Sequence, residues 1–419
     1  MLKMMQSKVE YLIEKGFFKQ QQRLLELFIF FSIFPIIKIF GITISFFFGI
    51  ILFYNFFRKG LKLFTINKYT EIFLLLFVVF VLISSLIPEE TYRSRAIYHY
   101  FKIPIQYIYW VLIAFFIKTW ILYFNVERVF KVSFYALVIA TVHMFLFNHI
   151  YYIYPPNAYA YIVVAIYPIA SIYIQKNFNF IIFSFISFIF IIAVFLIGSR
   201  TGFSLVLFEY VVLLLVGGKI RRFFIYVLIM ISVPVILYVG INFDFENLRY
   251  KMADQVEPYS PKIARALYMG EKLKELDKSY LTRLLMIEKG KKIFEKHPFF
   301  GVGAGNFTYY GEDINPRALS KHLHKTIWSY NKTSPQNSFL MILAENGIFA
   351  TISLGIVFLV ILFKGLKFFF IIQNDVRLNF YISFIALFFY SFILVTTMGT
   401  LFWILMGFYL IILYKNVRI

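Results

Sequence analysis

The sequence contains no cysteine and has few charged residues for its length. Charged residues make up 15% of the 419 positions, whereas soluble globular proteins carry about 25%. Because this leaves too little polar surface to cover a water-soluble particle, the composition excludes a soluble enzyme. The missing cysteines exclude disulfide bonds, thiolate metal sites and cysteine nucleophiles. A cleaved signal pattern is also lacking, since residues 1–23 are mixed polar, and we expect the first apolar block to be retained as a span.

Hydrophobic residues make up 61% of the sequence. They fall in blocks of roughly 17–20 residues, the length of a helix that crosses a roughly 30 Å hydrocarbon layer. In lipid each span must satisfy its own backbone hydrogen bonds, which helices do. The sequence therefore predicts an all-α polytopic membrane protein of about 12 transmembrane helices. The predicted spans are 26–41, 42–57, 69–87, 105–124, 129–147, 158–175, 178–198, 203–217, 223–241, 338–363, 378–396 and 399–414.

Basic residues predict how the chain is oriented. With the N-terminus inside, the inner segments carry 20 lysines and arginines, and the short outer loops carry four. Basic residues collect in cytoplasmic loops, so both termini are predicted to be cytoplasmic. This topological explanation also accounts for the net charge of +21 without a nucleic-acid partner.

One long polar segment interrupts the short loops. Residues 242–336 carry 16 basic and 11 acidic residues and separate the spans of 1–241 from those of 337–419. Long outer segments escape the charge rule, and a structureless insert of this size would be unusual. We therefore expect a large, partly helical extracytoplasmic loop.

Two helices are predicted within this loop, at 262–277 and 280–296. Pro298 and the glycines after it end the second helix. Its apolar residues recur at helical spacing while lysines occupy much of the remainder, so it could lie on the membrane surface. The apolar residues are Leu281, Leu284, Leu285 and Phe294, and the lysines are Lys289, Lys291, Lys292 and Lys296.

Two segments before residue 310 differ from ordinary span-and-loop sequence. The first is GSRTG at 198–202, where Arg200 lies between two apolar blocks. An arginine there indicates either a functional group or a side chain that reaches the headgroups. The second contains Arg283 and then HPFFGVGAGNF at 297–307. Its glycines permit tight turns and close approach to a ligand, although their spacing alone favours a plain turn over an anion site.

A third segment is SPQNS at 334–338. Ser334 and Asn337 are typical of residues that cap a helix start. Glu345 then falls inside the following span, where an acid indicates either a function or a structural ion pair. Lys38, Lys118 and Glu209 are further charges in or near predicted spans. Lys38 and Lys118 could extend toward an interface, and Glu209 either pairs with a neighbour or faces a cavity.

Together these segments resemble the bacterial O-antigen ligase and O-antigen polymerase family, membrane glycosyltransferases that act on undecaprenyl-diphosphate-linked glycans. The resemblance lies in GSRTG at the end of a span, Arg283 followed by HPFFGVGAGNF in the outer loop, and QNSFLMILAENG opening the next span. Order, spacing and membrane side agree over roughly residues 195–350, whereas the remaining spans agree only in hydropathy and number.

The resemblance implies a reaction at the periplasmic face of the bacterial cytoplasmic (inner) membrane. An acceptor hydroxyl attacks the anomeric carbon of the lipid-linked glycan, and the lipid diphosphate leaves. It implies that Arg200 and Arg283 stabilise this leaving group, because a guanidinium stays charged and binds phosphate bidentately. No metal or other cofactor is implied. The implied partners are the undecaprenyl-diphosphate-linked glycan donor, a glycan or lipid A-core acceptor, the lipid bilayer and a possible chain-length regulator.

Gln336 departs from the family pattern. Ligases of the family carry a histidine there, thought to activate the acceptor hydroxyl, whereas glutamine orients a hydroxyl but cannot take its proton near neutral pH. Either another residue is the base, with His322, His324 and Glu345 as candidates, or positioning suffices. This departure favours a polymerase over a ligase.

Further residues are candidates for binding substrate. Arg93 and Arg95 belong to a basic group on the second outer loop, which could hold the acceptor or the lipid diphosphate, or bind lipid headgroups only. The other candidates are Asn337, His322, His324, Gly301 and Gly303.

Three alternatives to a polymerase remain open. A ligase differs only in its acceptor. A flippase or transporter would show two related halves and interrupted helices near the midplane of the membrane. In this sequence the polar residues are concentrated in one outer loop. A structural or sensory membrane protein would tolerate the loss of Arg200 and Arg283.

Overall fold

The computed structural model describes residues 9–35, 38–39, 42–61, 66, 68–86, 97–151, 156–197, 199–215, 254–255, 258, 278–307, 310, 337–371, 376–392 and 400–412. The predicted span 223–241 and the predicted helix 262–277 lie outside these residues. Most of the predicted outer loop does so as well.

The described chain is helical apart from one short antiparallel ladder. The ladder pairs β1 (Lys38–Ile39) with β2 (Ile42–Thr43). The helices are α2 (Phe17–Ile33), α3 (Ile44–Arg58), α4 (Tyr69–Leu86), α5 (Ile97–Trp120), η2 (Ile121–Tyr123), α6 (Val126–Tyr151), α7 (Pro156–Asn177), α8 (Phe180–Ile197), α9 (Arg200–Leu215), α14 (Lys278–Lys296), α16 (Ser338–Ile371), α17 (Val376–Tyr390) and α18 (Thr400–Ile412).

Five of the described helices are long and apolar enough to cross a membrane. They span Tyr69–Leu86, Lys102–Tyr123, Val126–Leu146, Ala158–Asn177 and Ser338–Leu366. Five shorter apolar helices accompany them, at Ile44–Arg58, Phe180–Leu196, Thr201–Leu214, Val376–Tyr390 and Thr400–Ile411. The predicted all-helical, multi-pass class is confirmed, while the number of twelve spans stays a prediction.

The first predicted span, 26–41, is wrong in its position. Helix α2 begins at Phe17, directly after Gly16 in a left-handed conformation, and ends at Ile33. Pro35 follows, and a proline disfavours continuation of the helix because it lacks the amide hydrogen of the helical hydrogen bond. After it, Lys38–Ile39 and Ile42–Thr43 pair as the β1–β2 ladder. Hydropathy alone gives no sign of this break, because Pro35 lies within an unbroken apolar block.

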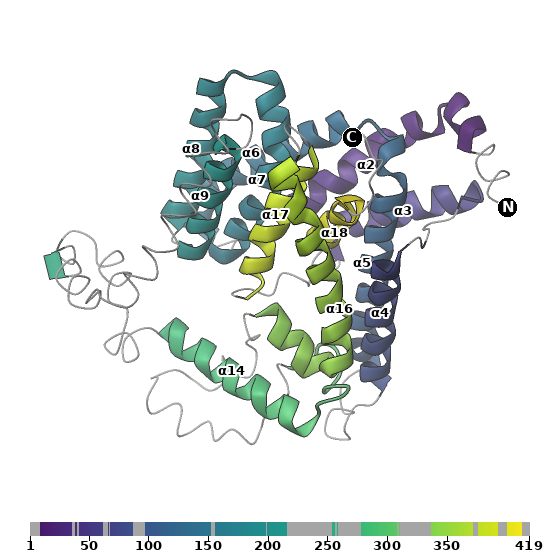
Figure 1. The fold of residues 1–419 in the computed structure, drawn as a ribbon, viewed down its shortest axis with the longest axis vertical. Helices are drawn as coiled ribbons and strands as arrows, with labels where there is room; N and C mark the ends of the chain where they lie inside the picture. The colour runs from purple at the N-terminus through teal and green to yellow at the C-terminus, as the bar shows by residue number, and fades with distance from the viewer. Residues whose placement is uncertain are drawn as a thin grey trace.

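Figure 1 shows how the helices are arranged. Helices α2 to α5 form one side, α6 to α9 form the other, and α16, α17 and α18 lie between them. The closest packing joins α16 to α4, α5 to α18, and α7 to both α6 and α17. Helix α14 lies beyond one end of the bundle and packs on α16.

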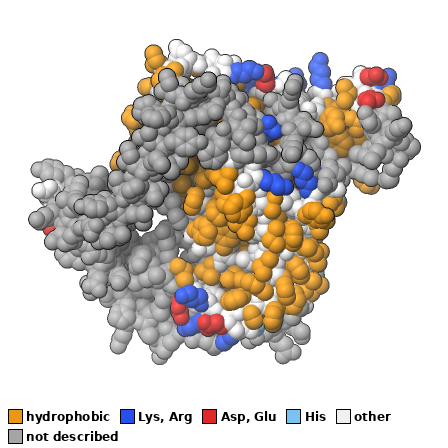
Figure 2. Space-filling model, viewed as in Figure 1, with side chains coloured by type: hydrophobic (Ala, Val, Ile, Leu, Met, Phe, Trp, Pro, Cys, Tyr) orange, Lys and Arg blue, Asp and Glu red, His pale blue; other side chains and the backbone are white. Residues whose placement is uncertain are grey.

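The surface of the bundle is strongly apolar. Figure 2 shows a broad hydrophobic area with lysine, arginine and acidic side chains gathered above and below it. Helix α8 contributes residues such as Ile181 and Phe185, whose side chains are 75% and 65% exposed. In water such exposure would be costly, so this surface is the one expected to face lipid tails.

Lys118 does not extend toward an interface, so that prediction is wrong. Its ammonium group forms an ion pair with Glu71 of α4, with 2.8 Å between the charged atoms. Both side chains are buried. Glu71 and Lys118 are far apart in the sequence, so the pair could not be predicted from local patterns. Helices α4 and α5 pack side by side and bring the two charges together.

Candidate functional site

Helix α16 is broken at Gly347, where the backbone leaves the helical region at φ 73°. The amide of Ile348 would ordinarily donate to the carbonyl of Ala344, four residues earlier. It donates instead to the carbonyl of Pro298, at 2.9 Å. Pro298 belongs to the glycine-rich segment 297–307, which follows the end of α14. The break in α16 is therefore filled by backbone from outside the helix.

The same segment also donates to the carbonyls that the break leaves open. The amide of Val302 donates to Ala344 at 3.1 Å, and that of Gly303 donates to the backbone carbonyl of Glu345 at 2.8 Å. The segment and the helix thus satisfy each other's buried backbone groups. This exchange holds the glycine-rich segment in place and confirms that Pro298 ends α14.

Two glycines permit this close approach. A Cβ atom at Gly347 would collide with the carbonyl of Phe299, and one at Gly301 would collide with the backbone of Glu345. Both glycines also have positive φ angles, 73° and 65°, which other residues adopt only with strain. The glycine pattern therefore serves the docking of the segment against α16.

The glycine-rich segment also contacts the ends of two other helices. A Cβ atom at Gly303 would lie 3.2 Å from the carbonyl of Ser84, near the end of α4. One at Gly305 would lie 2.9 Å from the side chain of Ile103, near the start of α5. We call the end of the bundle where α4 ends and α5 begins the loop end.

Glu345 lies directly beneath the glycine-rich segment and is 1% exposed. Its Oε1 atom accepts a hydrogen bond from the amide of Phe307 at 3.1 Å. Its Oε2 atom is buried and has no hydrogen-bond partner among the described residues. The structural ion pair considered from the sequence is absent within the described part of the chain, where Glu345 has no lysine or arginine partner.

Asn346 adds a second half-satisfied polar group beside Glu345. Its Oδ1 atom accepts a hydrogen bond from the hydroxyl of Ser84 at 2.9 Å, which ties α16 to α4. Its Nδ2 atom is buried and has no hydrogen-bond partner in the part of the chain that the structure describes. Buried polar atoms without partners are rare in folded proteins. Two of them on adjacent residues mark this position as a candidate for binding a polar ligand.

Lys289 is a site residue that sequence reasoning missed, because it was grouped with the exposed lysines of its helix. Lys291, Lys292 and Lys296 are exposed, but Lys289 is 3% exposed. Its ammonium group lies 5.1 Å from the centre of the Phe307 ring, within the range of a cation–π interaction. Burial lowers the pKa of Lys289 to about 8.

The described part of α14 buries residues outside the predicted apolar set, of which only Phe294 is described. Met286, Lys289 and Ile293 are buried, at helical spacings of three and four residues, and Phe294 is only half-buried. Met286 and Ile293 pack with the apolar residues of the glycine-rich segment. The spacing of Lys289 from these two residues was the available sequence signal. Within the described residues Lys289 has no ion-pair partner.

Other predicted site residues are described only in part. Asn337 caps α16, since its Oδ1 atom accepts the amide of Leu340 at 2.9 Å, and this prediction is confirmed. Arg200 is the first residue of α9, and Arg283 lies in α14. The side chains of both arginines lie outside the described part, as do Gln336, His322, His324, Arg93 and Arg95.

The order of the helices relates Arg200 to the loop end. Helices α6 and α7 run in opposite directions, because Glu127 at the start of α6 pairs with Lys176 at the end of α7. Helices α8 and α9 do so as well, because Phe195 near the end of α8 packs on Phe203 near the start of α9. Helix α4 ends at the loop end, so α5, α7 and α9 begin there. The first residue of α9 is Arg200. The glycine-rich segment and the start of α9 therefore belong to the same end of the bundle.

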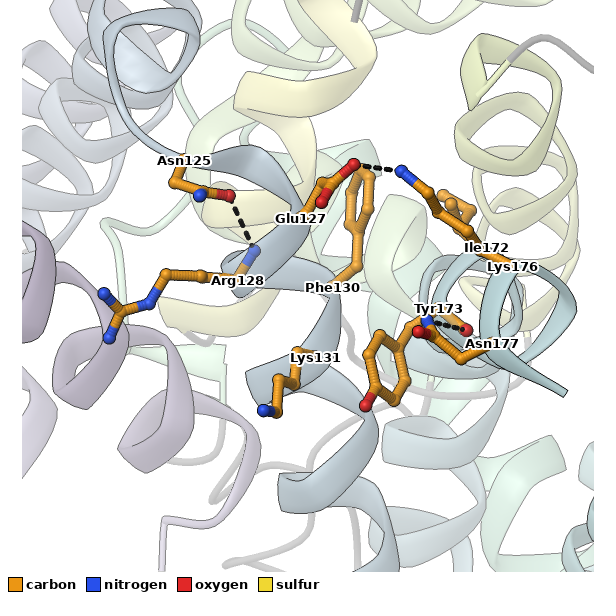
Figure 3. A pocket seen from close by; sticks show the side chains of 9 residues that line it. All are labelled: Asn125, Glu127, Arg128, Phe130, Lys131, Ile172, Tyr173, Lys176 and Asn177. Atoms are coloured by element: carbon orange, nitrogen blue, oxygen red, sulfur yellow. Dashed lines mark hydrogen bonds and ion pairs between the residues drawn. The ribbon is translucent and has the colours of Figure 1, made fainter.

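The opposite end carries a different polar cluster, shown in Figure 3. A pocket of about 250 Å³ lies between the start of α6 and the end of α7. Glu127 forms an ion pair with Lys176 across it, and the amide of Arg128 donates to the side chain of Asn125 at 3.1 Å. Arg128 reaches away to Glu26 at 2.7 Å. These charges are largely exposed and mostly paired.

Comparison with known proteins identifies a family for part of the chain. Residues 185–355 match the model of a family described as O-antigen ligase. This range runs from within α8 to just past the break in α16 and includes Arg200, Arg283 and Glu345. Over these residues it confirms the resemblance identified from the sequence. No curated protein matches the chain.

Proposed function

We propose that this protein polymerises undecaprenyl-diphosphate-linked oligosaccharide at the outer face of the cytoplasmic membrane. The observation that carries the proposal is the family match over 185–355, because this range contains both arginines and the glycine-rich segment. The buried polar atoms without partners at Glu345 and Asn346 lie within the same range. In this proposal the donor, the acceptor and the departing diphosphate meet at the loop end.

The proposed reaction forms one glycosidic bond and breaks one bond to phosphate. The acceptor hydroxyl oxygen attacks the anomeric carbon, and the lipid diphosphate leaves with the electron pair of the broken carbon–oxygen bond. Negative charge grows on the diphosphate during this step. Fixed guanidinium groups stabilise it in a water-poor site, and their planar forks hold two oxygens at once. We assign this role to Arg200 and Arg283, so the proposed mechanism requires no metal.

The acceptor proton requires a base. Of the candidates His322, His324 and Glu345, the contacts of Glu345 support a role. One of its oxygens holds the Phe307 amide while the other has no partner. This carboxyl could therefore receive a proton without releasing the glycine-rich segment. In this proposal Gln336 orients the acceptor hydroxyl by hydrogen bonding, as an amide side chain can.

Exchange of each arginine for lysine tests the proposal. In a knockout complemented with Arg200→Lys or Arg283→Lys, we expect surface polysaccharide to fall by about 100-fold, because lysine keeps the charge but loses the fork. Arg128→Lys, at the opposite end, is the matched control and should retain wild-type product. Full activity of both test variants, with normal protein levels, would overturn the proposal.

A ligase is the second candidate, and the description of the matching family favours it. The knockout phenotype separates the two activities. Loss of long chains, with single repeats still attached to the core, indicates a polymerase. Accumulation of complete lipid-linked chains indicates a ligase. Movement of glycan in proteoliposomes without bond formation would instead indicate a transporter.

A further inference from the structure

Glu209 is a buried acid for which the proposed reaction has no use. It lies in α9, nine residues after Arg200, and its side chain is fully buried. Both carboxyl oxygens lack a hydrogen-bond partner within the described residues. Helix α9 packs against α7, α8 and α17, so the carboxyl lies inside the apolar bundle.

No described cation faces this carboxyl. Helix α8 contains no charged residue. The basic residues of α7 and α17, Lys176 and Arg377, lie at the last and first turns of their helices. The titratable groups within electrostatic range are phenols, namely Tyr167 of α7 and Tyr409 of α18. Tyr161 and Tyr210 lie beside these two phenols.

Tyr167 cannot donate a hydrogen bond to Glu209, because its proton is already used. Its hydroxyl donates to the hydroxyl of Ser187 at 2.7 Å. Ser187 in turn donates to the backbone carbonyl of Phe183, at 2.7 Å. A hydroxyl has one proton and two acceptor lone pairs, so Tyr167 can offer Glu209 only an acceptor.

The same holds for Tyr409. The hydroxyl of Ser383 donates its one proton to the carbonyl of Ala165, at 2.7 Å. The contact of 2.8 Å between Ser383 and Tyr409 must therefore be a hydrogen bond donated by Tyr409. Tyr409 thus also presents only lone pairs to Glu209. An ionised carboxylate is itself an acceptor only, and two sets of acceptors facing each other repel.

We propose that Glu209 is a proton-binding site inside the helix bundle. One bound proton removes the unpaired charge of this buried carboxyl. An ordinary glutamate is ionised at neutral pH, but a charge without a partner in apolar surroundings costs far more than a neutral carboxyl. The neutral side chain then lies inside the bundle on α9, the helix that begins with Arg200.

The contrast with Glu71 supports this assignment. Glu71 is just as deeply buried, but Lys118 lies 2.8 Å away and balances its charge. Both acids lie in apolar helices, so the difference is the partner and not the depth. A bound proton gives Glu209 the neutrality that an ammonium group gives Glu71.

Infrared spectroscopy of the purified full-length protein in lipid vesicles tests the proposal. We expect the wild type to show a carbonyl stretching band of neutral carboxyls at neutral pH, and Glu209→Gln to lose the part of it that Glu209 contributes. Glu345→Gln is the matched control and should retain that part, because it removes a different buried acid. Exchange of sodium for choline in the buffer should leave the band unchanged.

Two results would overturn the proposal. One is a wild-type spectrum in which the signal lost in Glu209→Gln is that of a carboxylate. The other is a carboxylate signal that shifts with sodium or potassium, which would make the site a cation site. If Glu209→Gln fails to fold, a second measurement decides the question. The Glu345→Gln protein is prepared with carbon-13 in the carboxyl groups of its glutamates, and its infrared spectrum is recorded. A band of a neutral glutamate carboxyl in this variant supports the proposal, and the absence of this band overturns it.

Discussion

The two ends of the bundle hold their charged residues in different ways. At the opposite end, Glu127 pairs with Lys176 and Arg128 pairs with Glu26, with side chains between 15% and 67% exposed. At the loop end, Glu345 and Lys289 are almost fully buried and form no ion pair within the described residues. Exposed ion pairs lose little hydration and contribute little to the free energy of unfolding. Buried charges without partners are costly, so their presence marks the loop end as the functional one.

The loop end depends on backbone fit, and the largest expected effect comes from disturbing it. Gly347→Ala places a Cβ atom against the carbonyl of Phe299 and strains a positive φ angle. We expect it to release the glycine-rich segment, to lower the free energy of unfolding by about 4 kcal/mol or more and to abolish product formation. Thermal unfolding in detergent and limited proteolysis near residues 297–307 measure the change.

Gly355→Ala is the matched control for this prediction. It lies on the same helix, and an added Cβ atom would meet nothing within 4 Å. We expect a neutral effect or a gain of about 0.5–1 kcal/mol, as for a glycine in a helix interior. Equal stability of Gly347→Ala and the wild type would contradict the proposed role of the break in α16.

The ion pair between Glu71 and Lys118 tests whether pairing makes burial tolerable. Lys118→Met alone leaves the Glu71 carboxylate buried without a partner, and we expect a loss of about 3–5 kcal/mol. Adding Glu71→Leu should restore most of this loss, since an apolar pair of similar volume avoids the cost of burying charge. Equal stability of the single and double variants, measured by thermal unfolding, would show that the pair does not compensate for burial.

Lys289 gives a pH-dependent test at the loop end. Burial lowers its pKa from 10.5 to about 8. Between these pH values the unfolded chain binds more protons than the folded one, so stability should rise with pH in this window. We expect a rise of about 1–3 kcal/mol in the wild type and none from this source in Lys289→Met.

Thermal unfolding as a function of pH measures this difference. Lys291→Met is the matched control, because Lys291 is exposed on the same helix, and it should keep the wild-type slope. A Lys289→Met protein with the same slope as the control would mean that the buried lysine is not the titrating group.

The opposite end should show the smallest effect. Lys176→Ala removes an ion pair in which both side chains are more than 60% exposed. We expect a loss of about 0.5 kcal/mol or less, decreasing further at high salt. A loss of several kcal/mol, measured by thermal unfolding at low salt, would remove the contrast between the two ends.

Much of the fold could be predicted because its signals are local. The apolar blocks give the helices from α3 to α9 and from α16 to α18 within a few residues, apart from an earlier start of α5, a later end of α16 and an earlier end of α17. Pro298 and the glycines after it gave the end of α14, and Asn337 gave the start of α16. The first span was misplaced because the helix ends before Pro35, although the residues around this proline are apolar.

The site was only partly predictable, for a different reason. Motifs identified Glu345 and the glycine-rich segment, but not that this segment would fill the break at Gly347. Lys289 resembled its exposed neighbours, and Lys118 resembled an interfacial lysine. Each depends on a partner from a distant part of the sequence. Patterns of a few residues do not reveal such partners.

Apolar segment length and the distribution of basic residues thus determined, from the sequence alone, that this chain belongs in a membrane as helices. The physical reason is that lipid requires each span to satisfy its own backbone, so a span can be recognised without its neighbours. Tertiary structure decided which buried charges have partners. That depends on which helices lie side by side, and it separates the paired Glu71 from the unpaired Glu209 and Glu345.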